Sequence, residues 1–148
     1  MGQQQEDFIR RFCDCFGDGS YESRADVDQI LDMMAEDAEW QLWMPGGPII
    51  KGRENLRAEF ERQKTFMRNN KCNILNITSS DTVVMTERKD DAIIYGRNAP
   101  HHMVAVYVLN EDGLIQEWRE YLDMVDLTQK MGVTVDDAAS AHGEDVIS

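Results

Sequence analysis

The chain has 148 residues, of which 42% are hydrophobic and 29% charged, a composition typical of one folded globular domain. Its formal net charge of −13 repels phosphate backbones and anionic lipid surfaces, so we expect neither nucleic acid nor a membrane as partner. No apolar run approaches the length of a membrane span, and the N-terminus does not resemble a signal peptide. These features predict a cytoplasmic protein.

Apolar residues at helical spacing predict helices in the first half of the chain. The first runs over residues 3–16, and a Gly-Asp-Gly stop signal follows it. The second runs from about Arg24 to Met34, with Ser23 as its candidate N-cap. A third begins at Gly52 and Arg53, and its expected buried stripe is Leu56, Phe60 and Met67.

Strands are expected before and after the third helix. Residues 38–44 are rich in large apolar side chains, and a Pro-Gly-Gly-Pro turn ends them. Four more strand-like segments follow, at residues 71–79, 82–95, 101–110 and 114–123, and their short connections imply antiparallel neighbours. Helices followed by a run of strands predict an α+β fold, with helices on one face of the sheet and a cavity between the layers.

We expect a single catalytic domain over residues 1–131 and an acidic, loosely ordered tail over residues 132–148. The tail is rich in small and acidic residues and weakly apolar. It could instead close over the cavity or reach a partner subunit, and the sequence leaves this open.

Alternation along two of the strands gives three polar residues positions from which they could meet on one face of the sheet. Arg88 and Asp90 share one face of their strand, and Glu120 shares a face of the last strand with Trp118. A carboxylate on an apolar face is costly unless it is paired, and Arg88 is the available partner. An arginine between two carboxylates can hold one ionised while the other stays protonated, as a general acid and a general base require. From spacing alone, a structural ion-pair network or a solvated sheet face is the more common outcome.

Two segments resemble the limonene-1,2-epoxide hydrolase family, namely residues 84–90 (VMTERKD) and residues 117–123 (EWREYLD). Ala35-Glu36-Asp37, Met44-Pro45 and Gly52-Arg53 fit the same pattern, so the resemblance covers roughly residues 5–130. It implies the cone-shaped, curved mixed sheet of SnoaL-like and NTF2-like proteins, with N-terminal helices packed over a central cavity. It also implies a homodimer formed through the outer sheet face, and no metal or organic cofactor.

The resemblance assigns a role to each member of the polar trio. It implies Asp90 as the acid that protonates the epoxide oxygen, Glu120 as the base that activates water, and Arg88 as the bridge between them. The family usually carries aspartate where this chain has Glu120, whose extra methylene moves the base by about one bond length.

The first strand departs from the family, which holds its water there with a tyrosine and an asparagine. This chain has Trp40-Gln41-Leu42-Trp43 in that place, and a shift of one residue in the alignment reverses which side chains face the cavity. If Gln41 faces it, its amide could orient a water molecule. If Trp40 and Leu42 face it, a reaction without water, such as ring closure or isomerisation, is favoured.

Further candidate residues, beyond the polar trio, are expected to line an apolar pocket. Trp40, Gln41 and Trp43 are candidates for positioning water or substrate, and Trp118, His101 and Met103 for lining the pocket. Only one of His101 and His102 can face the cavity, and strand alternation favours His101, although such histidines more often face solvent or a turn. No third ligand is spaced for zinc.

Three tryptophans and nine methionines suit a bulky terpenoid, steroid or polyketide-like substrate. We therefore expect a cofactor-free epoxide hydrolase. An isomerase or cyclase of a secondary metabolite, and a non-catalytic small-molecule binding module, are the alternatives.

Overall fold

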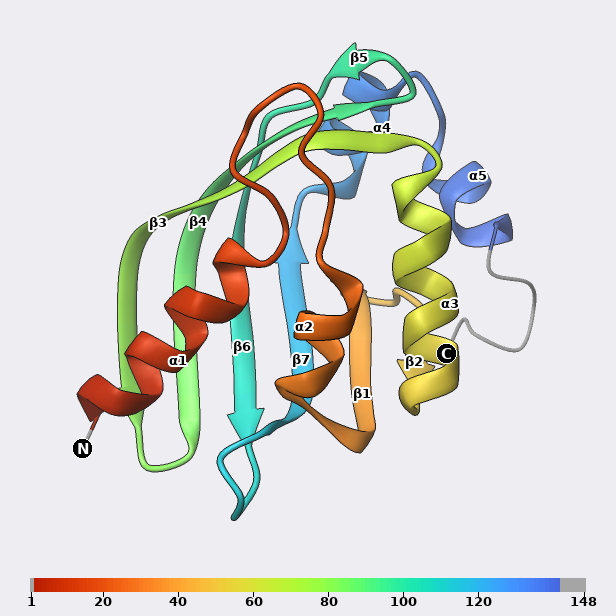
Figure 1. The fold of residues 1–148 in the computed structure, drawn as a ribbon. Helices are drawn as coiled ribbons and strands as arrows, with labels where there is room; N and C mark the ends of the chain where they lie inside the picture. The colour runs from red at the N-terminus through yellow and green to blue at the C-terminus, as the bar shows by residue number, and fades with distance from the viewer. Residues whose placement is uncertain (1, 142–148) are drawn as a thin grey trace.

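The computed structural model describes residues 2–141, which form five helices and a curled, unclosed sheet of seven strands (Figure 1). The helices are α1 (Gly2–Asp14), α2 (Val27–Asp32), α3 (Arg53–Lys64), α4 (Met124–Met131) and α5 (Val135–Ser140). The strands are β1 (Met34–Met44), β2 (Ile49–Lys51), β3 (Met67–Ser80), β4 (Val83–Ile94), β5 (Arg97–Asn98), β6 (His101–Leu109) and β7 (Ile115–Leu122). The expected α+β fold is confirmed.

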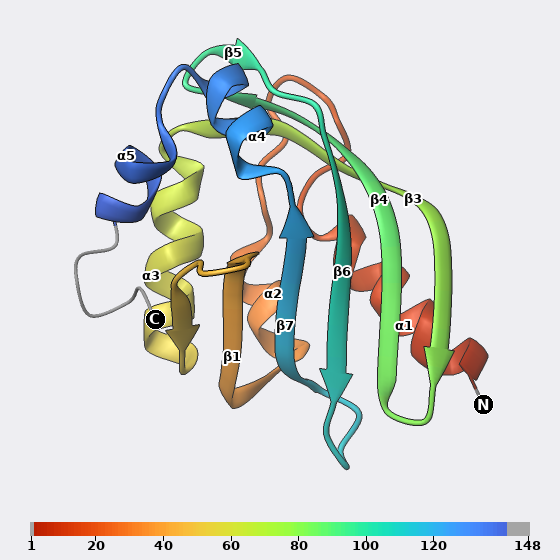
Figure 2. The same ribbon diagram turned by 180° about the vertical axis from the view of Figure 1, so that it is seen from behind.

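The sheet has the order β2-β1-β7-β6-β4-β3, with the short β5 paired to β4. β1 and β7 run parallel, and the other strand pairs of the described residues are antiparallel. Figure 1 shows α1, α2 and α3 on the inner, concave face, and Figure 2 shows the outer face from behind, with no helix covering its middle. The sheet is therefore mixed and covered on one side, so a cavity can form between the layers.

α1 packs against the concave face of the sheet through an apolar stripe (Figure 1). Ile9, Phe12 and Cys13 are buried against the sheet, as their helical spacing predicts. The ring of Phe12 meets Trp118 edge-on, with centroids 5.1 Å apart. Edge-to-face contacts of this kind are favourable because the positive ring edge meets the negative ring face.

α2 begins later than expected, at Val27. Its N-cap is Asp26, whose side chain accepts a hydrogen bond from the backbone N–H of Gln29. The hydroxyl of Ser23, the expected cap, instead accepts a bond from the backbone N–H of Asp18, 2.8 Å away, and stabilises the preceding loop. The prediction of Ser23 as cap was wrong because a second capping residue lies three positions further along the chain.

Two boundaries between helix and strand also differ from the prediction. Met67 belongs to β3, where it pairs with Ile94, and not to the buried stripe of α3, which ends at Lys64. β1 begins at Met34, four residues before the expected strand. In both places apolar residues continue across a change of period, so spacing alone does not locate the end of the helix.

The segment expected to be a loosely ordered tail contains α5. Thr134 and Asp137 form a reciprocal capping box at its start, and Ala138 packs against the main core. Residues 132–141 therefore form ordered structure on the domain, and residues 142–148 lie outside the described part. No helix within residues 2–141 is both long and apolar enough to cross a bilayer.

Candidate active site

Arg88 reaches across one strand to join carboxylates on two others. Arg88 and Asp90 point inward from β4, and Glu120 points inward from β7, with β6 between them. The residue of β6 opposite Glu120 is Ala105, whose small side chain leaves space above the sheet. Strands lie about 4.8 Å apart, so an arginine can span the two intervals that separate β4 from β7.

All three nitrogens of the Arg88 guanidinium donate hydrogen bonds. Its Nε donates to Oδ1 of Asp90 at 3.1 Å, and its Nη2 donates to Oδ2 of Asp90 at 2.7 Å and to Oε2 of Glu120 at 2.8 Å. Its Nη1 donates to the hydroxyl of Tyr107 at 2.8 Å. Because all three charged groups are at least 94% buried, with exposed fractions of 3%, 4% and 6%, these contacts are little weakened by solvent.

Tyr107 supports the trio from β6 and was missed by sequence reasoning. Its hydroxyl lies 3.0 Å from Oγ1 of Thr86, and burial raises the pKa of this phenol well above its ordinary value. Tyr107 has the same parity on its strand as His101, so alternation from His101 would have placed it on the cavity face.

Glu120 is the carboxylate that opens onto the cavity. Burial raises its pKa from 4.5 to about 7, because Asp90 adds to the effect of desolvation while Arg88 only partly offsets it. Oε2 accepts the bond from Arg88, whereas the other oxygen accepts no hydrogen bond from any residue within 2–141. A carboxyl group with this pKa can both take and give a proton near neutral pH.

Asp90 is held differently, because both of its oxygens are engaged by Arg88. The thiol of Cys72 adds a long contact of 3.8 Å to Oδ2. Side-on pairing with a guanidinium fixes the orientation of a carboxylate. The trio therefore contains one oriented carboxylate and one whose second oxygen is free.

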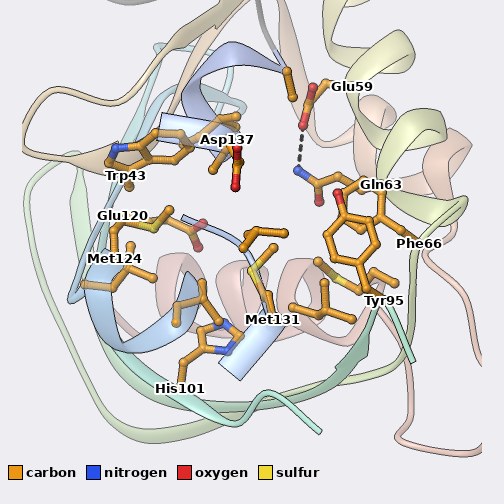
Figure 3. Close-up of a pocket in the computed structure, with 18 of the residues that line it drawn as sticks. Trp43, Glu59, Gln63, Phe66, Tyr95, His101, Glu120, Met124, Met131 and Asp137 are labelled. Carbon is orange, nitrogen blue, oxygen red and sulfur yellow. Dashed lines mark hydrogen bonds between the residues drawn. The ribbon is translucent and has the colours of Figure 1, made fainter. Parts of the chain in front are cut away.

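An apolar cavity leads to Glu120. Its outer part has a volume of about 170 Å³ and continues into an inner part of about 70 Å³ that reaches Arg88 and Asp90. Figure 3 shows Glu120 and His101 projecting into the outer part, with Trp43 and Met131 among the surrounding side chains. The charged groups thus lie at the inner end of a mostly apolar chamber.

The register of β1 turns Trp40 toward the cavity and Gln41 away from it. Trp40 pairs with Trp118 of β7 and is buried, while the amide of Gln41 donates to the backbone oxygen of Gly47 at 3.1 Å. Leu42 and Trp43 also line the outer cavity, because β1 is irregular after Gln41. The alternative in which Gln41 orients a water is therefore wrong, since its side chain is bonded to the turn.

Comparison of the sequence with models of known protein families shows the family of the chain. A model described as SnoaL-like domain matches residues 9–118, most of the chain. The chain belongs to the SnoaL-like domain family. A solved structure of an LEH-like epoxide hydrolase of M. tuberculosis is similar with a TM-score of 0.71, at 19% sequence identity, over 88% of this chain and 90% of that one. No curated protein matches the sequence significantly.

The remaining predicted pocket residues of this SnoaL-like domain lie around the trio. Met103 and His101 line both parts of the cavity, and Trp118 lines the inner part. His102 is exposed on the other face of β6, as strand alternation predicts. Among residues 2–141, no three His, Cys, Asp or Glu side chains lie together in an arrangement suited to a metal ion.

The outer rim of the cavity carries polar residues that sequence reasoning missed. Glu59 and Gln63 of α3 are joined by a 2.8 Å hydrogen bond, and Asp137 of α5 lies near them (Figure 3). Glu59 and Gln63 follow Leu56 by three and seven residues, so the helical stripe of α3 contained the signal. Asp137 could not be found, because its segment was expected to be loosely ordered.

Proposed function

We propose that this SnoaL-like protein is a cofactor-free enzyme that opens an epoxide of a bulky apolar substrate by adding water. The observation that carries the proposal is the single guanidinium of Arg88, which joins Asp90 and Glu120 at the inner end of an apolar cavity. The fold shared with an LEH-like epoxide hydrolase supports the same chemistry.

In the proposed reaction, protonated Asp90 donates to the epoxide oxygen while Glu120 takes a proton from water. The water oxygen forms a bond to one epoxide carbon, and the bond between that carbon and the epoxide oxygen breaks, which gives a diol. The proton lost by Asp90 equals the proton gained by Glu120, so the trio with Arg88 stays neutral throughout. A buried site favours such a step because no net charge is created away from solvent.

The inner cavity offers room and polar partners for the attacking water. Its volume of about 70 Å³ exceeds the minimum of about 15 Å³ that one water needs. The free oxygen of Glu120 can accept a hydrogen bond there, and the unpartnered indole N–H of Trp40, which lines the same space, can donate one. These two groups replace the amide that Gln41 does not supply.

Turnover in water labelled with heavy oxygen tests the proposal. A panel of cyclic and aryl epoxides should give diols that carry the label, and Asp90→Asn and Glu120→Gln should each reduce kcat by at least about a hundredfold. Asp91→Asn and Glu117→Gln are matched controls, because these exposed carboxylates lie on the same strands and should retain activity. Undiminished activity in the first two variants would leave the trio as a structural network.

Isomerisation or ring closure without water is the second candidate, and the register of β1 favours it. Trp40 and Leu42 occupy the cavity-facing positions, so β1 offers a water no amide or hydroxyl, only the indole N–H of Trp40. Glu120 could then take a proton from one carbon or hydroxyl of the substrate and return it to another atom. An unlabelled, rearranged product from labelled water would support this reaction against hydrolysis.

A further inference from the structure

His101 is a buried polar group next to the trio that the proposed reaction does not use. It begins β6 and lies directly opposite Asp90 in the antiparallel pairing with β4. Its side chain is 9% exposed and lines both the outer and the inner cavity. Figure 3 shows its ring projecting into the same chamber as Glu120.

The hydrogen bonding of His101 determines which ring nitrogen carries the proton. Nδ1 lies 2.8 Å from the backbone oxygen of Ala99. A carbonyl oxygen can only accept, so Nδ1 must donate, and in the neutral ring Nε2 then presents a lone pair. Burial lowers the pKa of His101, which keeps the ring neutral near pH 7.

Nε2 of His101 has no hydrogen-bond partner among the described residues, but it is accessible from the cavity. No residue in the described chain donates a hydrogen bond to it. The four buried side-chain atoms without a partner in residues 2–141 are Nε1 of Trp40, Nε of Arg53, Oδ1 of Asn69 and Nε1 of Trp118. Since Nε2 of His101 is not one of these enclosed atoms, a molecule in the cavity can reach it.

We propose that the substrate carries a hydroxyl group and that Nε2 of His101 accepts its hydrogen bond. In this tautomer Nε2 of the neutral ring can only accept a hydrogen bond. The oxygen of a ketone or an ether has no proton to donate, so at the same place its lone pair would face the lone pair of Nε2. The cavity would therefore select an apolar alcohol over the ketone of the same shape. The substrate class rests on the proposed function, whereas the preference for alcohols concerns binding and can be tested without turnover.

Matched probes test this preference directly. The affinities of tert-butylcyclohexanol and tert-butylcyclohexanone are measured by calorimetry for the wild-type protein, for His101→Phe and for His102→Phe. The ratio of the two affinities is compared between proteins, so the cost of desolvating each probe cancels. We expect His101→Phe to reduce the alcohol-to-ketone ratio about three- to tenfold, the effect of one neutral hydrogen bond, and His102→Phe to leave it unchanged.

Nitrogen NMR of the unmodified protein gives a second test that does not depend on a folded variant. The free protein should show His101 with a protonated Nδ1 and a bare Nε2. The alcohol should shift the Nε2 resonance toward that of a hydrogen-bonded acceptor, and the ketone should not. An Nε2 resonance that the alcohol leaves unmoved, or a ratio that His101→Phe does not reduce, would overturn the proposal. Neither result depends on whether the protein hydrolyses epoxides.

Discussion

Trp40 of β1 and Trp118 of β7 stack with ring centroids 4.3 Å apart and planes 5° from parallel. The parallel register pairs these two residues directly, so their rings lie at the same level of the sheet. The ring of Phe60 of α3 also stacks with Trp40, with centroids 5.0 Å apart. Neither indole N–H has a hydrogen-bond partner among the described residues, and both rings line the inner cavity beside Glu120.

Trp40→Phe should raise the pKa of Glu120 above about 7, because the indole N–H of Trp40 lies beside this carboxyl group and lowers its pKa, although it makes no regular hydrogen bond to it. Phenylalanine keeps an aromatic ring in the stack but removes the N–H. The acidic limb of the rate profile should move to higher pH, and infrared titration of the carboxyl group would measure the same change. Trp118→Phe also loses an indole N–H and serves as the control, with the pKa of Glu120 expected to stay where it is.

Glu120 should make the fold less stable as pH rises. The unfolded carboxyl loses its proton above about 4.5, whereas the folded one keeps it up to about 7. Between these values the native state binds more protons, so the free energy of unfolding should fall by about 3 kcal/mol across this window and no further above it. Glu120→Gln should remove this fall, and urea unfolding at several pH values would show the two curves separating. If the free energies of unfolding of the wild type and of Glu120→Gln changed with pH in the same way, the raised pKa of Glu120 would be contradicted.

Arg88→Met should destabilise the protein strongly, because it leaves Asp90 and Glu120 buried without a cation. The loss expected from breaking a buried network of this kind is about 3–5 kcal/mol in urea unfolding at neutral pH. The triple variant Arg88→Met, Asp90→Asn, Glu120→Gln should recover much of this loss, since it no longer buries unpaired charges. A triple variant as unstable as the single one would mean that Arg88 acts through packing.

Gln41→Ala should leave turnover unchanged, because the amide of Gln41 bonds to Gly47 and does not enter the cavity. Its loss should cost about 1 kcal/mol of stability, the usual contribution of one hydrogen bond. The comparison of kcat with the unfolding free energy separates the two roles. A large fall in kcat without a change of stability would place Gln41 in the site after all.

Alternation along the strands was sufficient to place the trio on one face. Arg88, Asp90 and Glu120 lie within a sheet of long, regular strands, where the side-chain period of two holds over many residues. The direction of Gln41 could not be derived in this way, because β1 pairs irregularly with β7 beyond it. A local irregularity of one residue reverses the two faces, and composition carries no signal of it.

The outer part of the cavity was hardest to predict because it is made by distant segments. Asp137 and Ala138 of α5 and Gln63 of α3 meet there only after the whole sheet has curled. The helical spacing of α3 indicates a buried stripe but not which residues lie at its open end. For α5, six residues with little apolar content gave no periodic signal, and the capping box of Thr134 was the available sign of a helix.

All three tryptophans of the chain line the cavity, Trp40 and Trp43 in its outer part and Trp40 and Trp118 in its inner part. The tryptophan fluorescence of the protein therefore comes from this one place. Any compound that enters should change the emission, whether or not it reacts. A compound library can thus be screened on the unlabelled protein before its reaction is known, and the first ligands found would guide the choice of substrate.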